Sequence, residues 1–401
     1  MPALAPRKVS NSVNALNLAA CASFVPIGVV TVFLGPMLPT LSARWSLNYS
    51  QAGSLFTVQY LFSTLAVMLS GVLYGRFGFR FPIKAGLVVM AIGVALLLAG
   101  SRFWGMVCIA AYGAGLGIAV PAANLLVAEV NPQRRSAALS VLNFCWSVGA
   151  VSCPFLVAAA ARSGRIQLML GILAGFSLTV AIGIAAIRNV TEPNGRSSAG
   201  TAGFMNIEWR HRAFIAMAVL FFVYVGTENS FGGWVASYAK SLGSMSLTLA
   251  LVTPSFFYGA LTLGRILAPF VLRTVDELRL AKLGLVVTCV GMTGLVLSQA
   301  LPGVAISAIL AGFGLSSVYP ITISLLSREF GAAASRVGAV MFTAANLGGA
   351  ILPWIVGISS TQFGTLKAGL AVPLLGSIMM YALYLREWKA LPAQLHQETI
   401  A

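Results

Sequence analysis

The stretch FFVYVGTENSFGGWVASYAK (221–240) decides how this chain folds, because it is apolar and aromatic over most of its length and carries Glu228 at its centre. A run of this length, formed as a helix, spans the hydrocarbon core of a bilayer. A carboxylate in the middle of such a run is costly and marks a functional site by default. On a helix, Tyr224, Glu228 and Tyr238 share one stripe, with Asn229 alongside. We therefore expect a membrane-embedded site on this segment.

Glu228 has three possible roles at the level of sequence. As a proton carrier it would bind and release a proton across a working cycle. As a sodium ligand it would share the ion with the Asn229 amide and with backbone carbonyls, which Gly232–Gly233 would free if the helix unwinds there. The third role is structural, as a carboxylate that is hydrogen-bonded to neighbouring helices. Intramembrane acids favour the two functional roles.

Composition places the whole chain in a membrane. Of its 401 residues, 58% are hydrophobic and only 8% are charged, which is typical of a polytopic membrane protein. The net charge of +16 comes from basic residues scattered singly between apolar runs, so it predicts membrane orientation and no nucleic-acid partner. The five cysteines have no metal or CxxC spacing. The only histidines, His211 and His396, lie in polar segments, so neither an enzyme nor a resident cofactor or metal is expected, apart from a coupling proton or a sodium ion near Glu228.

Apolar runs separated by basic or Gly/Pro-rich breaks predict an all-α protein with twelve transmembrane helices. One polar linker divides them into two bundles of six: residues 1–188, a cytoplasmic linker at 189–211, and residues 212–401. The expected helices are 14–42, 50–74, 81–101, 104–130, 136–161, 165–188, 212–239, 247–271, 279–300, 303–328, 336–361 and 366–386.

Basic residues predict the orientation. If the N-terminus is inside, 18 of the 25 Lys and Arg residues lie in cytoplasmic segments, and such a bias sets topology. We expect both termini in the cytoplasm, the first apolar run retained as a helix, and a multi-pass protein of the plasma (bacterial inner) membrane, embedded as a monomer in the lipid bilayer. The six basic residues of the opposite side are Arg44, Arg102, Arg162, Arg165, Lys240 and Lys367.

The two halves repeat one another. GAGLGIAVP (113–121) matches GFGLSSVYP (312–320) at an offset of 199 residues, and Gly149–Ala150 matches Gly349–Ala350 at 200. A nearly constant offset across half a chain indicates two pseudo-symmetric bundles.

The segment GVLYGRFGFRFPIK (71–84) resembles the major facilitator superfamily signature Gly-x-Leu-x-Asp-Arg-x-Gly-Arg-Arg. Gly71, Leu73, Arg76, Gly78 and Arg80 match, whereas Gly75 replaces the signature Asp. The patterns of 221–240 and of NFCWSVGAVSCP (143–154) are similar to the fucose permease-like and sodium-dependent glucose transporter-like branch. The resemblance implies a solute site at the membrane midplane and alternating access. It also implies a cytoplasmic gate, made here by Gly71, Arg76, Gly78, Arg80, Glu129, Arg273 and Glu329.

One departure concerns the coupling chemistry. The membrane carboxylates of fucose permease align with Gly35 and Val120 here, neither of which takes a proton. Glu228 is then the remaining central carboxylate. Arg265 is estimated to lie about 10 Å from Glu228 along the membrane normal, too far for a direct ion pair, so a structural or gating role is expected for it.

Amides and aromatic side chains recur on the other helices. Such groups supply paired donors and acceptors for sugar hydroxyls and a ring against which a sugar stacks, although Asn and Gln also bridge packed membrane helices. The leading hypothesis is ion-coupled uptake, with proton or sodium, of a sugar or a similar polar solute; the alternative is efflux of amphipathic or drug-like compounds. The candidate solute-binding residues are Gln59, Asn124, Asn143, Trp146, Glu228, Asn229, Trp234, Tyr258 and Asn346.

Overall fold

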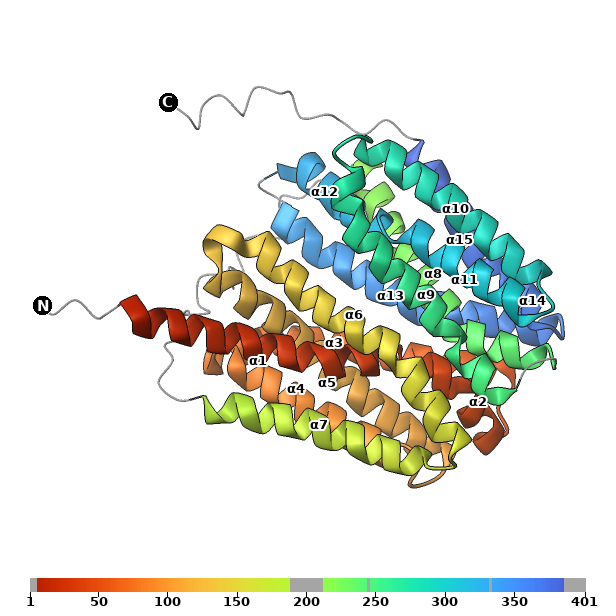
Figure 1. Ribbon diagram of the computed structural model, residues 1–401, viewed down its shortest axis with the longest axis horizontal. Coiled ribbons are helices and arrows are strands. Elements are labelled where there is room, and N and C mark those ends of the chain that lie inside the picture. Colours follow the sequence, from red (N-terminus) through yellow and green to blue (C-terminus); the bar gives the residue numbers. More distant parts are fainter. Residues whose placement is uncertain (1–5, 188–211, 244–245, 332–333, 386–401) are drawn as a thin grey trace, which may run out of the picture.

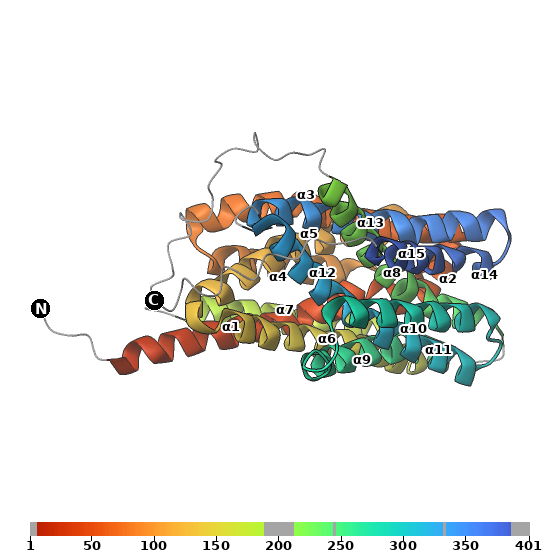
Figure 2. The same ribbon diagram turned by 90° about the horizontal axis from the view of Figure 1, so that it is seen from above.

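The computed structural model describes residues 6–187, 212–243, 246–331 and 334–385. They form two helical bundles whose long helices run along one common direction (Figures 1 and 2). The predicted linker, 189–211, lies outside the described residues. The first bundle contains α1 (Pro6–Val32), α2 (Leu34–Trp45), α3 (Tyr49–Phe77), α4 (Arg80–Leu96), α5 (Arg102–Val130), the 3-10 turn η1 (Pro132–Arg134), α6 (Arg135–Arg162) and α7 (Ile166–Ala186). The second contains α8 (Arg212–Ser241), α9 (Leu247–Val271), α10 (Glu277–Leu297), α11 (Leu301–Leu315), α12 (Val318–Phe330), α13 (Ala334–Gln362), α14 (Leu366–Gly369) and α15 (Ala371–Tyr384).

The predicted all-α membrane fold is confirmed. Among the described residues, eleven helical stretches are long and apolar enough to cross a bilayer. The twelfth is α4, which has 17 residues and continues through turns that bond Leu97 N to Val94 O and Ala99 N to Leu96 O. Each bundle therefore contributes six crossings.

Three of the twelve predicted helices are each broken into two pieces, and the twelfth of them divides at Leu370 into α14 and α15. The first breaks between Val32 and Leu34, just before Pro36, and the tenth breaks at Ser316–Ser317, just before Pro320. A proline has no backbone N–H and its ring crowds the preceding turn, so a helix kinks or stops there. The Ser316 hydroxyl caps the break in the tenth helix by donating to Phe313 O at 2.6 Å.

The helix around 221–240 does not unwind at Gly232–Gly233, the arrangement considered for a sodium role of Glu228. α8 is continuous from Arg212 to Ser241, because the two glycines serve close packing. A Cβ on Gly232 would overlap the Tyr258 hydroxyl, and one on Gly233 would lie 2.6 Å from the Phe56 ring. The carbonyls of this segment therefore stay within the helix.

Glycine contacts repeat between the bundles. Gly113 of α5 lies directly on the main chain of α3 at Gln59, and Gly312 of α11 lies in the same way on α9 at Phe257. Small residues let membrane helices approach to this distance. The equivalent contacts of the two halves confirm the repeat that the sequence predicts. A second such pair is Gly149 against Val25 and Gly348 against Phe222.

The bundles meet mainly along α3–α13, α6–α9 and α2–α8. We call the end at which α6 and α8 terminate the distal end, at the right of Figure 1, and the opposite end proximal. Four hydrogen bonds join the bundles within the described residues, and all lie between the midplane and the distal end. They are Ser50 N to Thr361 Oγ1, Thr57 Oγ1 to Ala350 O, Ser255 Oγ to Val151 O, and Tyr60 Oη to Asn229 Oδ1.

Gly35 makes one of the close distal approaches between the bundles. A Cβ on this residue would lie 2.7 Å from Gly232 O and 3.0 Å from Gly233 Cα. Together with the four hydrogen bonds, this contact closes the distal end in the conformation described.

Replacing Gly348 by Ala should lower the melting temperature of the detergent-solubilised protein by several degrees, because the new methyl group would overlap the Phe222 carbonyl on α8 and overpacking costs roughly 1–3 kcal/mol. The control is Gly171→Ala on α7, where a Cβ meets nothing within 4 Å. Equal melting temperatures for the two variants would contradict the proposed packing.

Candidate functional site

Glu228 pairs with Arg265 in the interior of the second bundle. Arg265 Nη2 lies 4.0 Å from Glu228 Oε1, and the two side chains are 26% and 12% exposed, respectively. The expectation that Arg265 is too far for an ion pair is therefore wrong. Counted from the distal ends of α8 and α9, the two residues differ in height by only about 7 Å at 1.5 Å per residue. Helical side chains also lean towards the N-terminus of their helix, which directs Arg265 towards the level of Glu228.

Aromatic side chains surround this pair. Arg265 Nη2 donates to Tyr224 Oη at 3.4 Å, and the Tyr224 ring packs against Tyr319 of α12 with ring centroids 5.1 Å apart. Arg265 Nε is buried and has no hydrogen-bond partner among the described residues. Since a guanidinium cannot lose its proton in a protein, a permanent cation stands beside the one central carboxylate.

The residue next to Glu228 connects the bundles. Tyr60 of α3 donates its hydroxyl proton to Asn229 Oδ1, while Asn229 Nδ2 donates to Val225 O in its own helix at 2.8 Å. The carboxylate is thus one residue away from a hydrogen bond that crosses from one bundle to the other. A change in the ion pair can act directly on the contact between the bundles.

On the other side of the midplane, the first bundle holds a neutral polar chain. Gln59 Nε2 donates to Thr31 O at 3.2 Å, and Tyr112 Oη donates to Gln59 Oε1 at 3.2 Å. Trp146 Nε1 donates to Thr31 Oγ1 at 3.4 Å. Gln59 is 2% exposed, so its amide supports the neighbouring helices, whereas Trp146 is half-buried.

The remaining predicted binding residues divide by exposure. Asn124 and Asn346 are half-buried and Asn143 is exposed, and the amides of Asn124 and Asn143 donate only to carbonyls of their own helices. Asn346 makes no hydrogen bond within the described part of the chain. Trp234 and Tyr258 are 1% and 3% exposed, and Trp234 Nε1 donates to Pro353 O at 3.0 Å. In this conformation these two rings are covered.

The predicted gate residues lie at the proximal end. Gly78 has φ +77°, a backbone conformation that only glycine adopts easily, and Arg80 donates to Ile187 O. No ion pair of Arg76, Glu129 or Glu329 is formed within the described residues. Arg273 instead lies over the Phe270 ring, 5.4 Å from its centroid. Gly71 lies within α3, near the proximal end of that helix, and is half-buried.

A proximal ion pair that we did not predict joins Arg328 Nη1 and Glu277 Oε2 at 3.4 Å. Ser324 also donates to both Glu277 oxygens. The sequence signal for it was the isolated Asp276–Glu277 at the start of α10, where Asp276 caps the helix. Tyr319 was also missed, because an aromatic residue in an apolar run has no distinguishing neighbour in sequence.

A comparison with protein families matches residues 18–353 to the Major Facilitator Superfamily. The chain belongs to this superfamily. The resemblance read from the signature loop is thereby confirmed. Members of the superfamily, including the relatives below, are transporters and not enzymes, and this chain is a multi-pass membrane transporter.

Among the relatives of this superfamily chain, the sodium-dependent glucose transporter 1 of Danio rerio is 23% identical over 388 residues, covering 85% of this chain and 64% of that protein. This chain thus spans less than two thirds of that relative's length. The glucose/galactose transporter of Brucella abortus biovar 1 (strain 9-941) is 26% identical over 364 residues, covering 84% of this chain and 85% of that protein. The crystal structure of a D-xylose-proton symporter has the same fold, with a TM-score of 0.74 and 18% identity over 94% of this chain and 98% of that chain.

The ion pair predicts an asymmetric response to mutation. Glu228→Gln leaves a cation that cannot be neutralised, whereas Arg265→Gln leaves a carboxylate that can take a proton. We expect Glu228→Gln to lower the melting temperature more than Arg265→Gln does at pH 5. The double variant should lose less melting temperature than the two single variants lose together, because removing both partners of a buried pair costs less than removing one. Thermal unfolding of the four proteins in detergent checks this; additive losses would contradict a direct pair.

Proposed function

We propose that this transporter takes up a sugar or a similar polyhydroxylated solute together with a proton, by alternating access. The observation that carries the proposal is the partly accessible Glu228–Arg265 pair, one residue from the Tyr60–Asn229 bond between the bundles. A carboxylate in this position can bind a proton and, through its neighbours, influence how the two bundles meet.

The chemistry of the site supports a polar, neutral solute. Arg265, Asn346 and Asn124 offer hydrogen-bond donors and acceptors, and Trp146 offers an indole ring. Paired donors and acceptors suit vicinal hydroxyls, and an aromatic face suits the apolar face of a sugar ring. Two relatives, the sodium-dependent glucose transporter 1 of Danio rerio and the glucose/galactose transporter of Brucella abortus, are named for sugars, which supports the same class.

A proton fits this site better than sodium does. A sodium ion needs several oxygen ligands, but the carbonyls near Gly232–Gly233 remain within the continuous helix α8. Glu228 also faces the fixed positive charge of Arg265 at 4.0 Å, which repels a second cation. A proton needs only the carboxylate itself.

In the proposed cycle, the empty transporter holds Glu228 ionised against Arg265. Solute hydroxyls accept hydrogen bonds from Arg265 and compete with Glu228 for it, and a released Glu228 takes a proton. Because each ligand favours the other, solute and proton bind together. The neutral complex then allows the Tyr60–Asn229 contact to break and the bundles to rock.

The distribution of the basic residues supports one orientation of the protein in the membrane. The proximal end carries most of the Lys and Arg residues, as cytoplasmic ends do, so we assign both termini to the cytoplasm of a bacterial inner membrane. The closed distal end then corresponds to an inward-facing conformation. We propose that the functional unit is a monomer, because each chain contains both halves of the site.

Glu228→Gln should abolish accumulation driven by a proton gradient, while exchange of labelled for unlabelled solute continues at a rate within a few-fold of wild type, because a permanently neutral site no longer needs a proton. Proteoliposomes assayed for both activities test this. Asp276→Asn, at the exposed proximal start of α10, is the matched control and should accumulate solute normally, because an asparagine still caps the helix. Accumulation by Glu228→Gln against a gradient would refute proton coupling through this residue.

The solute class is tested by uptake of a panel of labelled hexoses and pentoses with no gradient, a proton gradient or a sodium gradient. We expect saturable uptake of at least one sugar that a proton gradient accelerates. Acceleration by sodium alone would overturn the choice of ion. No uptake of any sugar would overturn the solute class and favour efflux of amphipathic compounds.

A further inference from the structure

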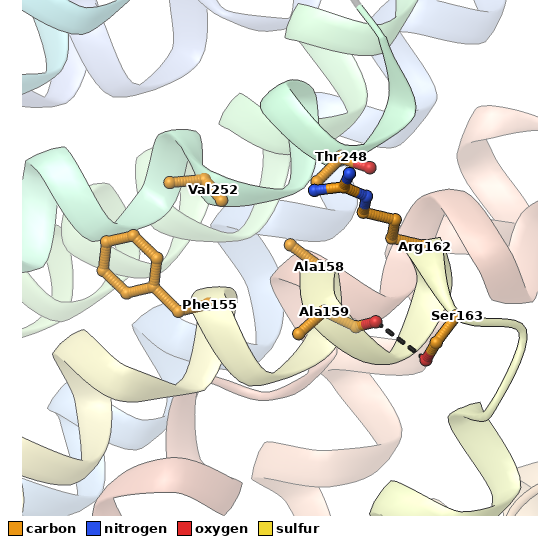
Figure 3. A pocket seen from close by; sticks show the side chains of 7 residues that line it. All are labelled: Phe155, Ala158, Ala159, Arg162, Ser163, Thr248 and Val252. Atoms are coloured by element: carbon orange, nitrogen blue, oxygen red, sulfur yellow. Dashed lines mark hydrogen bonds between the residues drawn. The ribbon is translucent and has the colours of Figure 1, made fainter.

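A cavity of about 480 Å³ lies between α6 of the first bundle and α9 of the second, at the distal end (Figure 3). It is separate from the Glu228 site. Its lining is polar at one side, with Arg162, Ser163 and Thr248, and apolar elsewhere, with Phe155, Ala158, Ala159 and Val252. The hydrogen bond from Ser255 Oγ to Val151 O, at 3.0 Å, joins the same two helices one turn further into the membrane.

The polar side of this cavity carries an exposed cation, Arg162. The Arg162 guanidinium extends across the cavity towards Thr248 (Figure 3). Neither its nitrogens nor the Thr248 hydroxyl has a hydrogen-bond or ion-pair partner among the described residues, whereas Arg44, at the same end, donates to Leu98 O at 2.9 Å. The Ser163 hydroxyl is engaged with Ala159 O at 2.9 Å.

The described part of the chain has no acidic side chain at this end. Of the five acidic residues that the structure describes, Glu228 is central, and Glu129, Asp276, Glu277 and Glu329 lie at the proximal ends of their helices. No described carboxylate can therefore pair with Arg162, which leaves an anion from outside the chain as its partner. At the surface of a bilayer, lipid phosphates are the abundant anions, and basic side chains near the surface attract them.

We propose that this cavity is a binding site for an anionic phospholipid, with the lipid phosphate on Arg162 and Thr248 and an acyl chain along the apolar wall. The apolar wall distinguishes a lipid from a free anion, because Phe155 is 50% exposed and borders the cavity about two helical turns inward from Arg162 along α6. Charge-assisted bonds from an arginine to a phosphate are strong and directional.

A lipid bound at this position would influence which conformation the transporter adopts, an inference that rests on the proposed alternating access. The lipid contacts both bundles where they must separate when the distal end opens. A ligand that binds one conformation better than another shifts the population towards it. The bound lipid therefore stabilises the distal-closed conformation.

Lipid binding is tested on the whole chain without any transport assay. The binding result can therefore be interpreted even if the proposed transport function is wrong. The delipidated protein is titrated with phosphatidylglycerol or phosphatidylcholine and analysed by native mass spectrometry. We expect one phosphatidylglycerol to bind at least fivefold more tightly than phosphatidylcholine. Arg162→Gln should weaken that binding about five- to tenfold, and Arg162→Lys should weaken it less.

The matched control is Arg165→Gln, which removes an exposed arginine three residues away that does not line the cavity. It should bind phosphatidylglycerol as wild type does. Equal losses in Arg162→Gln and Arg165→Gln, or equal binding of the two lipids by wild type, would overturn the site. Displacement of phosphatidylglycerol by an equal concentration of glycerol phosphate would show an anion site without a lipid component, and would overturn the lipid assignment.

Discussion

A charge held halfway across a bilayer requires a partner, and in this transporter Glu228 and Arg265 supply each other with one. The pair joins α8 to α9 within the second bundle, and the Tyr224 hydroxyl and the Tyr319 ring complete its surroundings. Because the arginine is permanently charged, the carboxylate is the only member of the pair that can change its charge. Every proposal on coupling follows from that asymmetry.

The pair acts on the rest of the molecule through the contact between the bundles. Asn229 accepts the hydroxyl proton of Tyr60, and a few residues further along α8, Gly232 and Gly233 allow Gly35 to approach closely. One helix therefore carries the titrating group, the hydrogen bond across the bundles and the surface on which the distal end closes. This arrangement explains why a continuous α8 suits the site better than an unwound one: a rigid helix transmits a change at Glu228 to the closing surface.

The two halves share their packing but differ in their chemistry. Equivalent glycines, Gly113 and Gly312, bring equivalent helices to main-chain contact. The first bundle, however, faces the midplane with the neutral chain of Gln59, Thr31 and Trp146, whereas the second bundle faces it with an ion pair. In the proposed function, this division places the titratable group on one side of the solute and uncharged hydrogen-bonding groups on the other.

The sequence by itself determined the fold class, the repeat and the presence of a lone acid, Glu228, in the middle of a membrane helix. Membrane helices are specified locally, because a run of about 20 apolar residues has no other stable state in a bilayer, and a lone acid within one is conspicuous. Helix breaks before Pro36 and Pro320 were not foreseen, since a proline within a membrane helix either kinks it or divides it according to its neighbours.

Only the tertiary structure decided which side chains meet. Arg265 and Glu228 are 37 positions apart, and whether they touch depends on the relative height and rotation of two antiparallel helices, where a few ångströms separate an ion pair from none. Tyr60 and Asn229 belong to different bundles, so their contact depends on how the halves close. The cavity beside Arg162 likewise exists only because the end of α6 meets the beginning of α9. The pattern of apolar residues along the chain specifies each helix, but the contacts between helices arise from their packing in three dimensions.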